Sequence, residues 1–135
     1  MDIDRPDVVA EIAAAFTDYE KALVAGDVGA LDAWFWPSER VTRFGVADHQ
    51  TGAAQLHAWR AAQPPLPPGR RLFDTRITTF GPDTATVTTM FDYPDAPDRP
   101  GRQSQTWVRF PDGWRIVHAH VSHPLPAAGP AAANS

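Results

Sequence analysis

Residues 101–123, GRQSQTWVRFPDGWRIVHAHVSH, carry the pattern that decides the fold. Two long segments rich in β-branched and aromatic residues flank Pro111, Asp112 and Gly113, and the glycine permits the positive φ that a tight hairpin turn needs. We therefore expect two antiparallel strands, over residues 101–110 and 114–123. Strict alternation along the second strand puts five side chains on one face: Trp114, Ile116, His118, His120 and Ser122.

The two faces of this hairpin change character along their length. Each is apolar near the turn or in the middle and polar towards the far end. A sheet face buried in a simple two-layer fold would be apolar throughout, so the pattern indicates a sheet that curves around a pocket. On the first strand Arg102, Ser104 and Thr106 alternate with Gln103 and Gln105, and periodicity does not say which set points inward.

The sequence before the hairpin divides into a mainly helical part and a strand part. Helices are predicted over residues 7–25, 28–34 and 52–63, and strands over residues 40–45, 70–80 and 84–93. Asp7 and Asp27 are the expected N-caps of the first two helices, and Gly26 ends the first.

This order of elements predicts an α+β fold, in which a curved antiparallel sheet packs against three helices from the N-terminal half and encloses a pocket. The length of 135 residues is that of one domain, which we expect over residues 1–123. Residues 124–135 are rich in proline and alanine, and we expect them to be disordered.

Composition excludes several classes of protein. The net charge of −4 at pH 7 argues against nucleic-acid binding, which needs a basic face. The chain has no cysteine, which rules out disulfides, thiolate metal ligands and cysteine nucleophiles and fits a reducing compartment. No segment approaches the ~18 apolar residues of a membrane span, and no signal-like segment opens the chain. We expect a soluble cytoplasmic protein without a membrane or nucleic-acid partner.

Five stretches together resemble one branch of a known superfamily: residues 31–36 (LDAWFW), 40–45 (RVTRFG), 77–81 (ITTFG), 101–109 (GRQSQTWVR) and 113–123 (GWRIVHAHVSH). The branch is the AtzH-like family of the NTF2-like (SnoaL-like) superfamily, and the resemblance spans about residues 7–123. It implies a cone-shaped fold with an interior pocket. The family includes a 1,3-dicarboxyurea hydrolase and oxalurate-catabolism proteins that are encoded beside amidases.

The resemblance also implies a site. In the hydrolase of this family, a tyrosine on the first helix and an arginine on the first strand are implicated in catalysis. Matching the family's motifs to this sequence places them at Tyr19 and Arg43. From its own sequence context, Tyr19 is either a core tyrosine with a bonded hydroxyl or a phenol at the pocket rim. Arg43 either forms an internal ion pair with Asp48, Asp74 or another acid, or it holds a substrate carboxylate in a bidentate pair.

A second group of polar residues is assigned to substrate binding on the same resemblance: Arg102, Ser104, Gln105, His118 and His120. The family usually has a small residue at the position of His118, so this chain departs from the pattern there. His118 and His120 have a spacing that could chelate zinc on a strand, but no third ligand is evident. We expect no metal and no cofactor, and we interpret His120 as a neutral hydrogen-bonding group of the pocket, near Ser122.

The expected function is that of a small cofactor-independent, decarboxylating amidohydrolase of nitrogen catabolism, acting on an N-carboxylated urea or a similar small anionic carbamoyl compound. The alternative is a non-catalytic small-acid-binding protein or an accessory subunit of an amidase. A third class, a SnoaL-like isomerase, would need a carboxylate base such as Asp74 or Asp92 inside the pocket, although we expect Asp74 to pair with Arg76.

The predicted partners are a small anionic substrate, a second copy of the chain and an amidase. The sheet face that lies away from the helices often dimerises in this fold. Trp107, Val117 and Val121 are the apolar residues expected to be buried there.

Overall fold

The computed structural model describes residues 1–126, so most of the segment 124–135 for which disorder was predicted lies outside the described residues. Its helices are α1 (Pro6–Ala25), α2 (Val28–Trp34) and α3 (Ala53–Ala61), and its strands are β1 (Thr42–Phe44), β2 (His49–Thr51), β3 (Arg71–Phe80), β4 (Thr84–Asp92), β5 (Gly101–Phe110) and β6 (Gly113–Ser122). The predicted elements are all present, with ends that differ by a few residues. β2 was not predicted as a strand, because three residues are too few to display an alternation.

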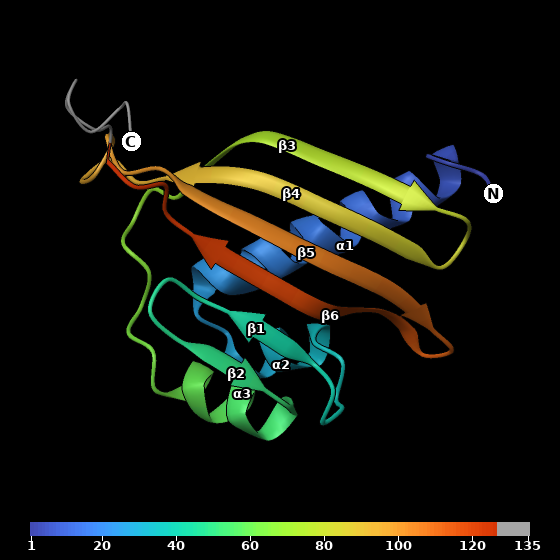
Figure 1. Ribbon diagram of the computed structural model, residues 1–135, viewed down its shortest axis with the longest axis horizontal. Helices are drawn as coiled ribbons and strands as arrows, with labels where there is room; N and C mark the ends of the chain where they lie inside the picture. The colour runs from blue at the N-terminus through green and yellow to red at the C-terminus, as the bar shows by residue number, and fades with distance from the viewer. Residues whose placement is uncertain (127–135) are drawn as a thin grey trace, which may run out of the picture.

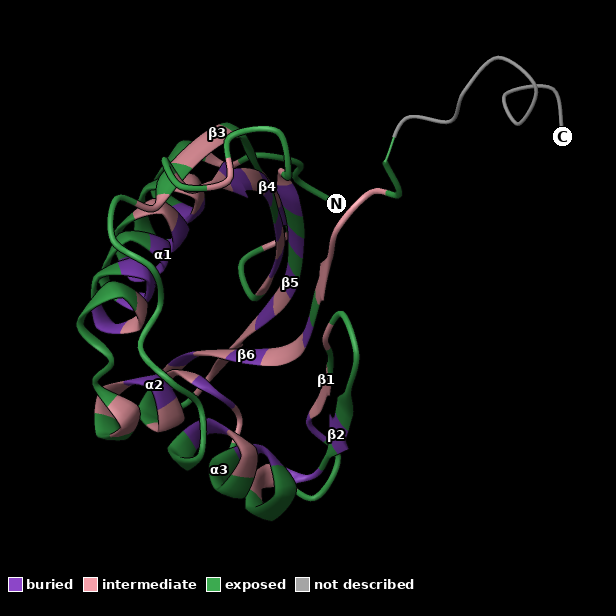
Figure 2. Cartoon of the chain, turned by 90° about the vertical axis from the view of Figure 1, so that its left-hand side faces the viewer, coloured by how far each residue is buried: buried purple, intermediate pink, exposed green. Residues whose placement is uncertain are grey.

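The six strands form one sheet in the order β2-β1-β6-β5-β4-β3 (Figure 1). Strands β3 to β6 are the expected antiparallel meander, whereas the short β1 pairs with β6 in parallel. The sheet curves, with α1 facing β3 to β5 across the interior and α2 and α3 lying at one end (Figure 2). The α+β class with a curved sheet against three helices is therefore confirmed.

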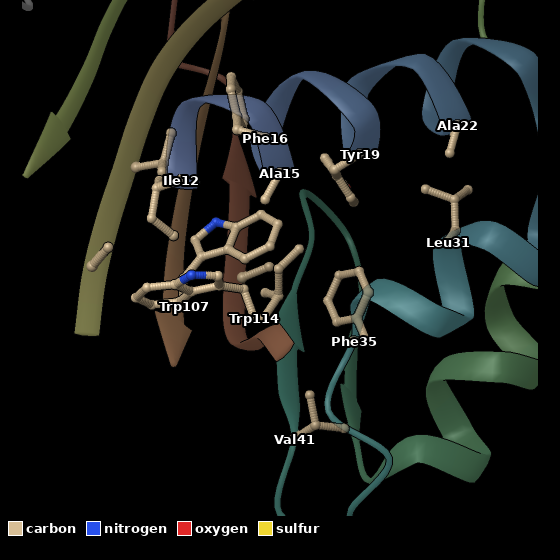
Figure 3. Close-up of a cluster of buried hydrophobic side chains, with 14 of the residues drawn as sticks. Ile12, Ala15, Phe16, Tyr19, Ala22, Leu31, Phe35, Val41, Trp107 and Trp114 are labelled. Atoms are coloured by element: carbon tan, nitrogen blue, oxygen red, sulfur yellow. The ribbon is translucent and has the colours of Figure 1, made fainter. Parts of the chain in front are cut away.

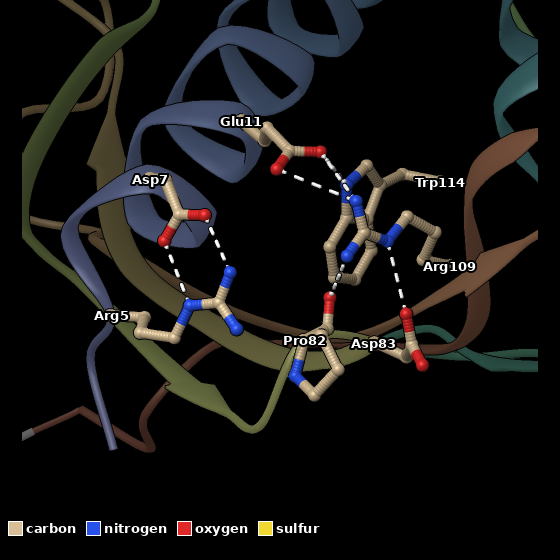
Figure 4. Close-up of polar contacts among 7 residues, drawn as sticks. All are labelled: Arg5, Asp7, Glu11, Pro82, Asp83, Arg109 and Trp114. Atoms are coloured by element: carbon tan, nitrogen blue, oxygen red, sulfur yellow. Dashed lines mark hydrogen bonds and ion pairs between the residues drawn. The ribbon is translucent and has the colours of Figure 1, made fainter. Parts of the chain in front are cut away.

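The helix ends agree with the sequence in two of three cases. Gly26 ends α1 with a φ of 66°, a left-handed conformation that glycine adopts without strain. Asp27 caps α2, its Oδ1 accepting a hydrogen bond from the Ala30 amide at 3.1 Å. The prediction for Asp7 was wrong: α1 begins at Pro6, and the Asp7 carboxylate accepts two hydrogen bonds from the Arg5 side chain instead (Figure 4).

A β-bulge in β6 overturns the predicted faces of the closing hairpin. Thr106 pairs with His118, but the next residue, Trp107, pairs with Ile116, so Val117 is an additional residue in the ladder. Such an insertion reverses the alternation beyond it. Trp114 and Ile116 are therefore buried against the helices, while His118 and His120 point to the opposite, outer face.

The core fills the space between α1 and the inner face of the sheet (Figure 3). Trp107 is completely buried and packs edge-on against Tyr19 and Trp34. Val121 also faces inward, since it pairs with the buried Gln103. Trp107 and Val121 thus do not provide the apolar outer surface expected for a dimer, because both residues lie on the helix side of the sheet.

Arg109 fastens the start of α1 to the sheet (Figure 4). Its guanidinium donates to Glu11 of α1 at 3.1 Å, to Asp83 at 3.0 Å and to the Pro82 carbonyl at 2.7 Å. Trp114 donates to the same Glu11 carboxylate at 3.2 Å. These contacts fix the N-terminal end of the helix whose other half borders the cavity described below.

Within the described residues, no helix combines the length and the apolar character that crossing a membrane requires.

Candidate functional site

A cavity of about 490 Å³ lies between the C-terminal end of α1, α3 and the proline-rich segment that follows α3. Its apolar wall comes from α1, α2 and the prolines, and its polar groups are Arg43, Arg60 and Gln63, beside the Trp59 ring. The full lining is Leu23, Val24, Ala25, Gly26, Val28, Leu31, Arg43, Trp59, Arg60, Gln63, Pro64, Pro65, Leu66 and Pro67. The lining holds two guanidinium groups and no carboxylate, so it suits a small anion.

Arg43 reaches this cavity from the inner face of β1. Its guanidinium carbon lies 3.7 Å from the centroid of the Trp59 ring, a close stacking contact. Its Nη1 donates to Asp48 at 2.8 Å and to Gln50 at 3.1 Å. Gly45 leaves room for this pair, because a Cβ there would lie 2.7 Å from Nη1 and 2.6 Å from the Asp48 carboxylate.

The internal ion pair considered for Arg43 therefore exists, with Asp48 as the acid. Burial raises the pKa of Asp48, but hydrogen bonds from Gln50 and Arg43 outweigh it, so the pKa lies below its usual value. Asp48 stays ionised at neutral pH and holds Nη1 in place. Within residues 1–126 the other guanidinium nitrogens of Arg43 make no hydrogen bond, so they are free to bind a ligand.

Tyr19 lies on α1 one turn before Leu23, which lines the cavity; Tyr19 itself is not part of the lining. It is 5 % exposed and packs edge-on against Phe35 and Trp107 (Figure 3). Burial raises its pKa above the usual value, against the opposing charges of Arg60, Arg70 and Arg43. The phenol is therefore protonated at neutral pH, and no hydrogen bond within the described residues uses its hydroxyl.

The raised pKa of Tyr19 predicts how stability depends on alkaline pH. A tyrosine in the unfolded chain ionises near pH 10, whereas the buried phenol resists ionisation. Its contribution to stability is thus complete below pH ~10 and is lost as the pH rises towards the folded-state pKa. Urea unfolding between pH 8 and 11 should show the free energy of unfolding falling more steeply in wild type than in Tyr19→Phe. Parallel curves would show that the phenol is not desolvated.

Gln105 shares a row of the sheet with Arg43. Arg43 of β1 and Gln105 of β5 both pair with Ala119 of β6, the strand that lies between them. Their backbones are therefore two strand spacings apart, about 4.8 Å each. The Gln105 carbonyl accepts a hydrogen bond from the Trp107 indole at 3.0 Å. Its amide Nε2 is buried without a partner in the described residues, and Gln105 is not among the residues that line the cavity.

None of the predicted substrate-binding residues lines this cavity: Gln105 is buried in the core, and the other four lie on the outer face of the sheet. Arg102 donates to Ser122, Ser104 is registered against His120, and His118 bonds the Thr42 hydroxyl at 2.8 Å. His120 is exposed and packs against Phe44 rather than hydrogen-bonding in a pocket. On β5, Gln103 and Gln105 point inward, whereas Arg102, Ser104 and Thr106 point outward. Because of the bulge at Val117, His118 and His120 lie on the outer face as well.

The carboxylates considered for an isomerase are also outside the cavity. Asp92 pairs with Arg71 on the outer face, where Nε donates at 2.9 Å. Asp74 is exposed, with a φ of 54°, at a register shift between Phe73 and Arg76. No ion pair joins Asp74 to Arg76 within residues 1–126, because this irregularity breaks the alternation that put them on one face. In the same residues no three His, Asp or Glu side chains gather as they would around a metal ion.

A second cavity, of about 480 Å³, lies between α1 and β3. Its two buried charges, Glu20 and Arg70, already satisfy each other at 2.9 Å, and Gln103 and Tyr93 bond to Arg70 as well. Because these polar groups are saturated, this cavity is a weaker candidate for a ligand site.

Sequence reasoning missed three residues around Arg43, namely Gln50, Trp59 and Arg60. Gln50 is registered directly opposite Arg43 on β2, a strand that was not predicted. Trp59 and Arg60 belong to α3, whose position relative to the sheet no local pattern specifies. One signal for Arg60 was available in the sequence. Arg60 lies one helical turn after the apolar Leu56, on the same face of α3, and both residues are buried in the structure.

Comparison with known proteins agrees with this architecture. The AtzH-like family model matches residues 1–125. A protein of unknown function from Pectobacterium atrosepticum is 44% identical, with a TM-score of 0.88, over 91% of this chain and 95% of its own. A cystatin-like fold protein from Burkholderia xenovorans is 46% identical, with a TM-score of 0.88, over 96% and 99%.

More distant structures share the fold alone. An NTF2-like superfamily protein from Salmonella enterica is 23% identical, with a TM-score of 0.73, over 93% of this chain and 96% of its own. The fold is therefore NTF2-like, as the sequence resemblance implied. No curated protein matches the sequence.

Proposed function

This chain belongs to the AtzH-like family, and from that premise we propose that it is a cofactor-independent, decarboxylating amidohydrolase. Its substrate would be an N-carboxylated urea or a similar small anionic carbamoyl compound of nitrogen catabolism. We propose that it acts in the cytoplasm.

The observation that carries this proposal is the cavity at Arg43. Arg43 stacks on Trp59 and is oriented by Asp48 and Gln50, so its guanidinium is preorganised to bind a planar anion. Such a group binds a carboxylate without first losing side-chain freedom, which favours both affinity and orientation. The lining contains no acid that would compete for the guanidinium from inside the cavity.

The chemistry requires only a proton and a fixed substrate. In an N-carboxylated urea the bond between the carboxylate carbon and nitrogen breaks, its electron pair stays on nitrogen, and carbon dioxide leaves. The nitrogen takes a proton, for which we propose the Tyr19 phenol as the source; because Tyr19 is not part of the lining, the proton would pass through one water molecule, and solvent water then restores it to the phenol. The nearby charges of Arg60 and Arg43 would stabilise the transient phenolate.

Steady-state kinetics on 1,3-dicarboxyurea test the proposal, with carbon dioxide release measured above the rate in buffer. Tyr19→Phe should lower kcat by about 10²-fold, the lower range for general acid catalysis, with little change in KM. Tyr93→Phe is the matched control, because it removes the hydroxyl of the other tyrosine, which binds Arg70 rather than the cavity. It should retain kcat within about threefold.

Equal rates for wild type and Tyr19→Phe would contradict the role of the phenol. If neither 1,3-dicarboxyurea nor oxalurate is consumed faster than in buffer, the hydrolase proposal fails. Binding of such acids without turnover would then favour the non-catalytic alternative, a small-acid-binding or accessory subunit.

A further inference from the structure

Arg60 is a buried guanidinium that the protein leaves incompletely paired. It is 7 % exposed, and its Nε is a buried nitrogen without a hydrogen-bond partner in the described residues. The group lies over the Phe35 ring at 4.7 Å and lines the same cavity as Arg43. A buried cation without adequate partners is costly, so its presence needs a reason.

The acids around Arg60 do not supply that reason. Asp32 forms a long ion pair with Nε at 3.4 Å that is not aligned as a hydrogen bond, its side chain is 30% exposed, and the same carboxylate also bonds His57. Asp48, the next acid near the cavity, is bound to Arg43 and Gln50. Burial lowers the pKa of the Arg60 guanidinium; Tyr19 and Asp32 oppose this effect, and the charge of Arg43 adds to it, so the pKa lies below its usual value. Two cations therefore border one cavity, and neither is neutralised from within it.

We propose that Arg60 is a second anion-binding residue of this cavity, so that the site takes molecules with two carboxylates in preference to molecules with one. Arg43 approaches from the sheet and Arg60 from α3, so each can bind a different end of a small ligand. This inference deepens the proposed function, on which its relevance to catalysis rests, because it assigns to a named residue the recognition of a second charge.

The contact of Arg60 with Phe35 and Trp59 allows a simpler role, in which the arginine only fills space beneath α3. The two roles differ in what they discriminate. A packing residue affects all ligands alike, whereas an anion-binding residue affects a dicarboxylate far more than a monocarboxylate.

Isothermal titration of malonate and acetate, which differ by one carboxylate, separates these roles without requiring turnover. Wild type should bind malonate more tightly than acetate. Arg60→Met retains apolar volume and should weaken malonate binding by roughly 30-fold or more, while changing acetate binding by less than about threefold. Arg60→Lys keeps the charge but loses the planar guanidinium, so its affinity for malonate should lie between those of wild type and Arg60→Met. Arg76→Met, at an exposed position on β3, is the control for the loss of one positive charge.

Equal weakening of malonate and acetate in Arg60→Met would overturn the proposal, and so would wild-type binding that shows no preference for malonate. If Arg60→Met does not fold, as judged by its thermal melt, the malonate-to-acetate ratio of Arg60→Lys decides: an unchanged ratio overturns the assignment. A malonate preference that depends on Arg60, combined with no turnover of 1,3-dicarboxyurea, would sustain this inference and refute only the proposed reaction.

Discussion

Replacing Arg43 with methionine should lower kcat/KM for 1,3-dicarboxyurea by roughly 10²–10³-fold, with a thermal midpoint close to that of wild type. The loss follows from removing a buried charge partner of the substrate carboxylate, which typically costs about 2–5 kcal/mol of binding free energy. Stability changes little because the carboxylate left behind, Asp48, has a side chain that is 42% exposed and can be hydrated.

Two further variants locate the origin of this loss. Arg43→Lys keeps the charge but loses the bidentate fork and the planar stacking on Trp59, so we expect an intermediate rate. Arg40→Met removes the same charge from an exposed position three residues earlier and should leave kcat/KM within about twofold of wild type. A large effect of Arg40→Met would mean that long-range attraction, rather than contact, explains the result.

Replacing Arg70 with methionine should lower the free energy of unfolding by about 3–5 kcal/mol, the largest stability effect that we expect. Its side chain is 5% exposed and bonds Glu20 of α1 at 2.9 Å, Tyr93 at 3.1 Å and Gln103 of β5 at 3.1 Å. Without it, the Glu20 carboxylate stays buried between α1 and the sheet with only the Gln103 amide as a partner, at 3.2 Å. Because Glu20 follows Tyr19 on α1, the same network also fixes the helix that carries the phenol.

The adjacent arginine provides a matched control for this prediction. Arg71 forms a similar ion pair with Asp92, but its side chain is 65% exposed, so Arg71→Met should lower the free energy of unfolding far less than Arg70→Met does. The double variant Arg70→Met, Glu20→Gln should recover part of the lost stability, because no carboxylate remains buried without a cation. Urea unfolding of the four proteins measures these differences. Similar losses for Arg70→Met and Arg71→Met would contradict the assignment of a buried network.

Much of the architecture could be predicted from local patterns. The apolar stripe of α1, the cap at Asp27 and the left-handed glycine at Gly26 act within a few residues, so the sequence alone specifies them. The hairpin at Pro111–Gly113 is equally local. Family resemblance added Tyr19 and Arg43 as candidates, and the structure brings Arg43 to a cavity lined by a second arginine and places Tyr19 one helical turn from it.

The remaining features depend on contacts that no local pattern contains. The bulge at Val117 adds one residue to β6, and this reverses the faces assigned to His118 and His120. Gly101 is a second feature that no local pattern predicts. A Cβ at this position would lie 2.0 Å from Cζ of Phe91 on the neighbouring strand, so a glycine is needed there to make room for the Phe91 ring and not to form a turn. Arg60 depends on where α3 docks, which is set by the proline-rich segment and the short strands together.

The most direct test of the central claim is to follow 1,3-dicarboxyurea by ¹³C NMR with and without the wild-type protein. The proposed reaction predicts that N-carboxyurea and one equivalent of carbon dioxide form faster than in buffer, and that Arg43→Met abolishes most of this acceleration. Decay of 1,3-dicarboxyurea at the buffer rate in the presence of folded protein would contradict the claim.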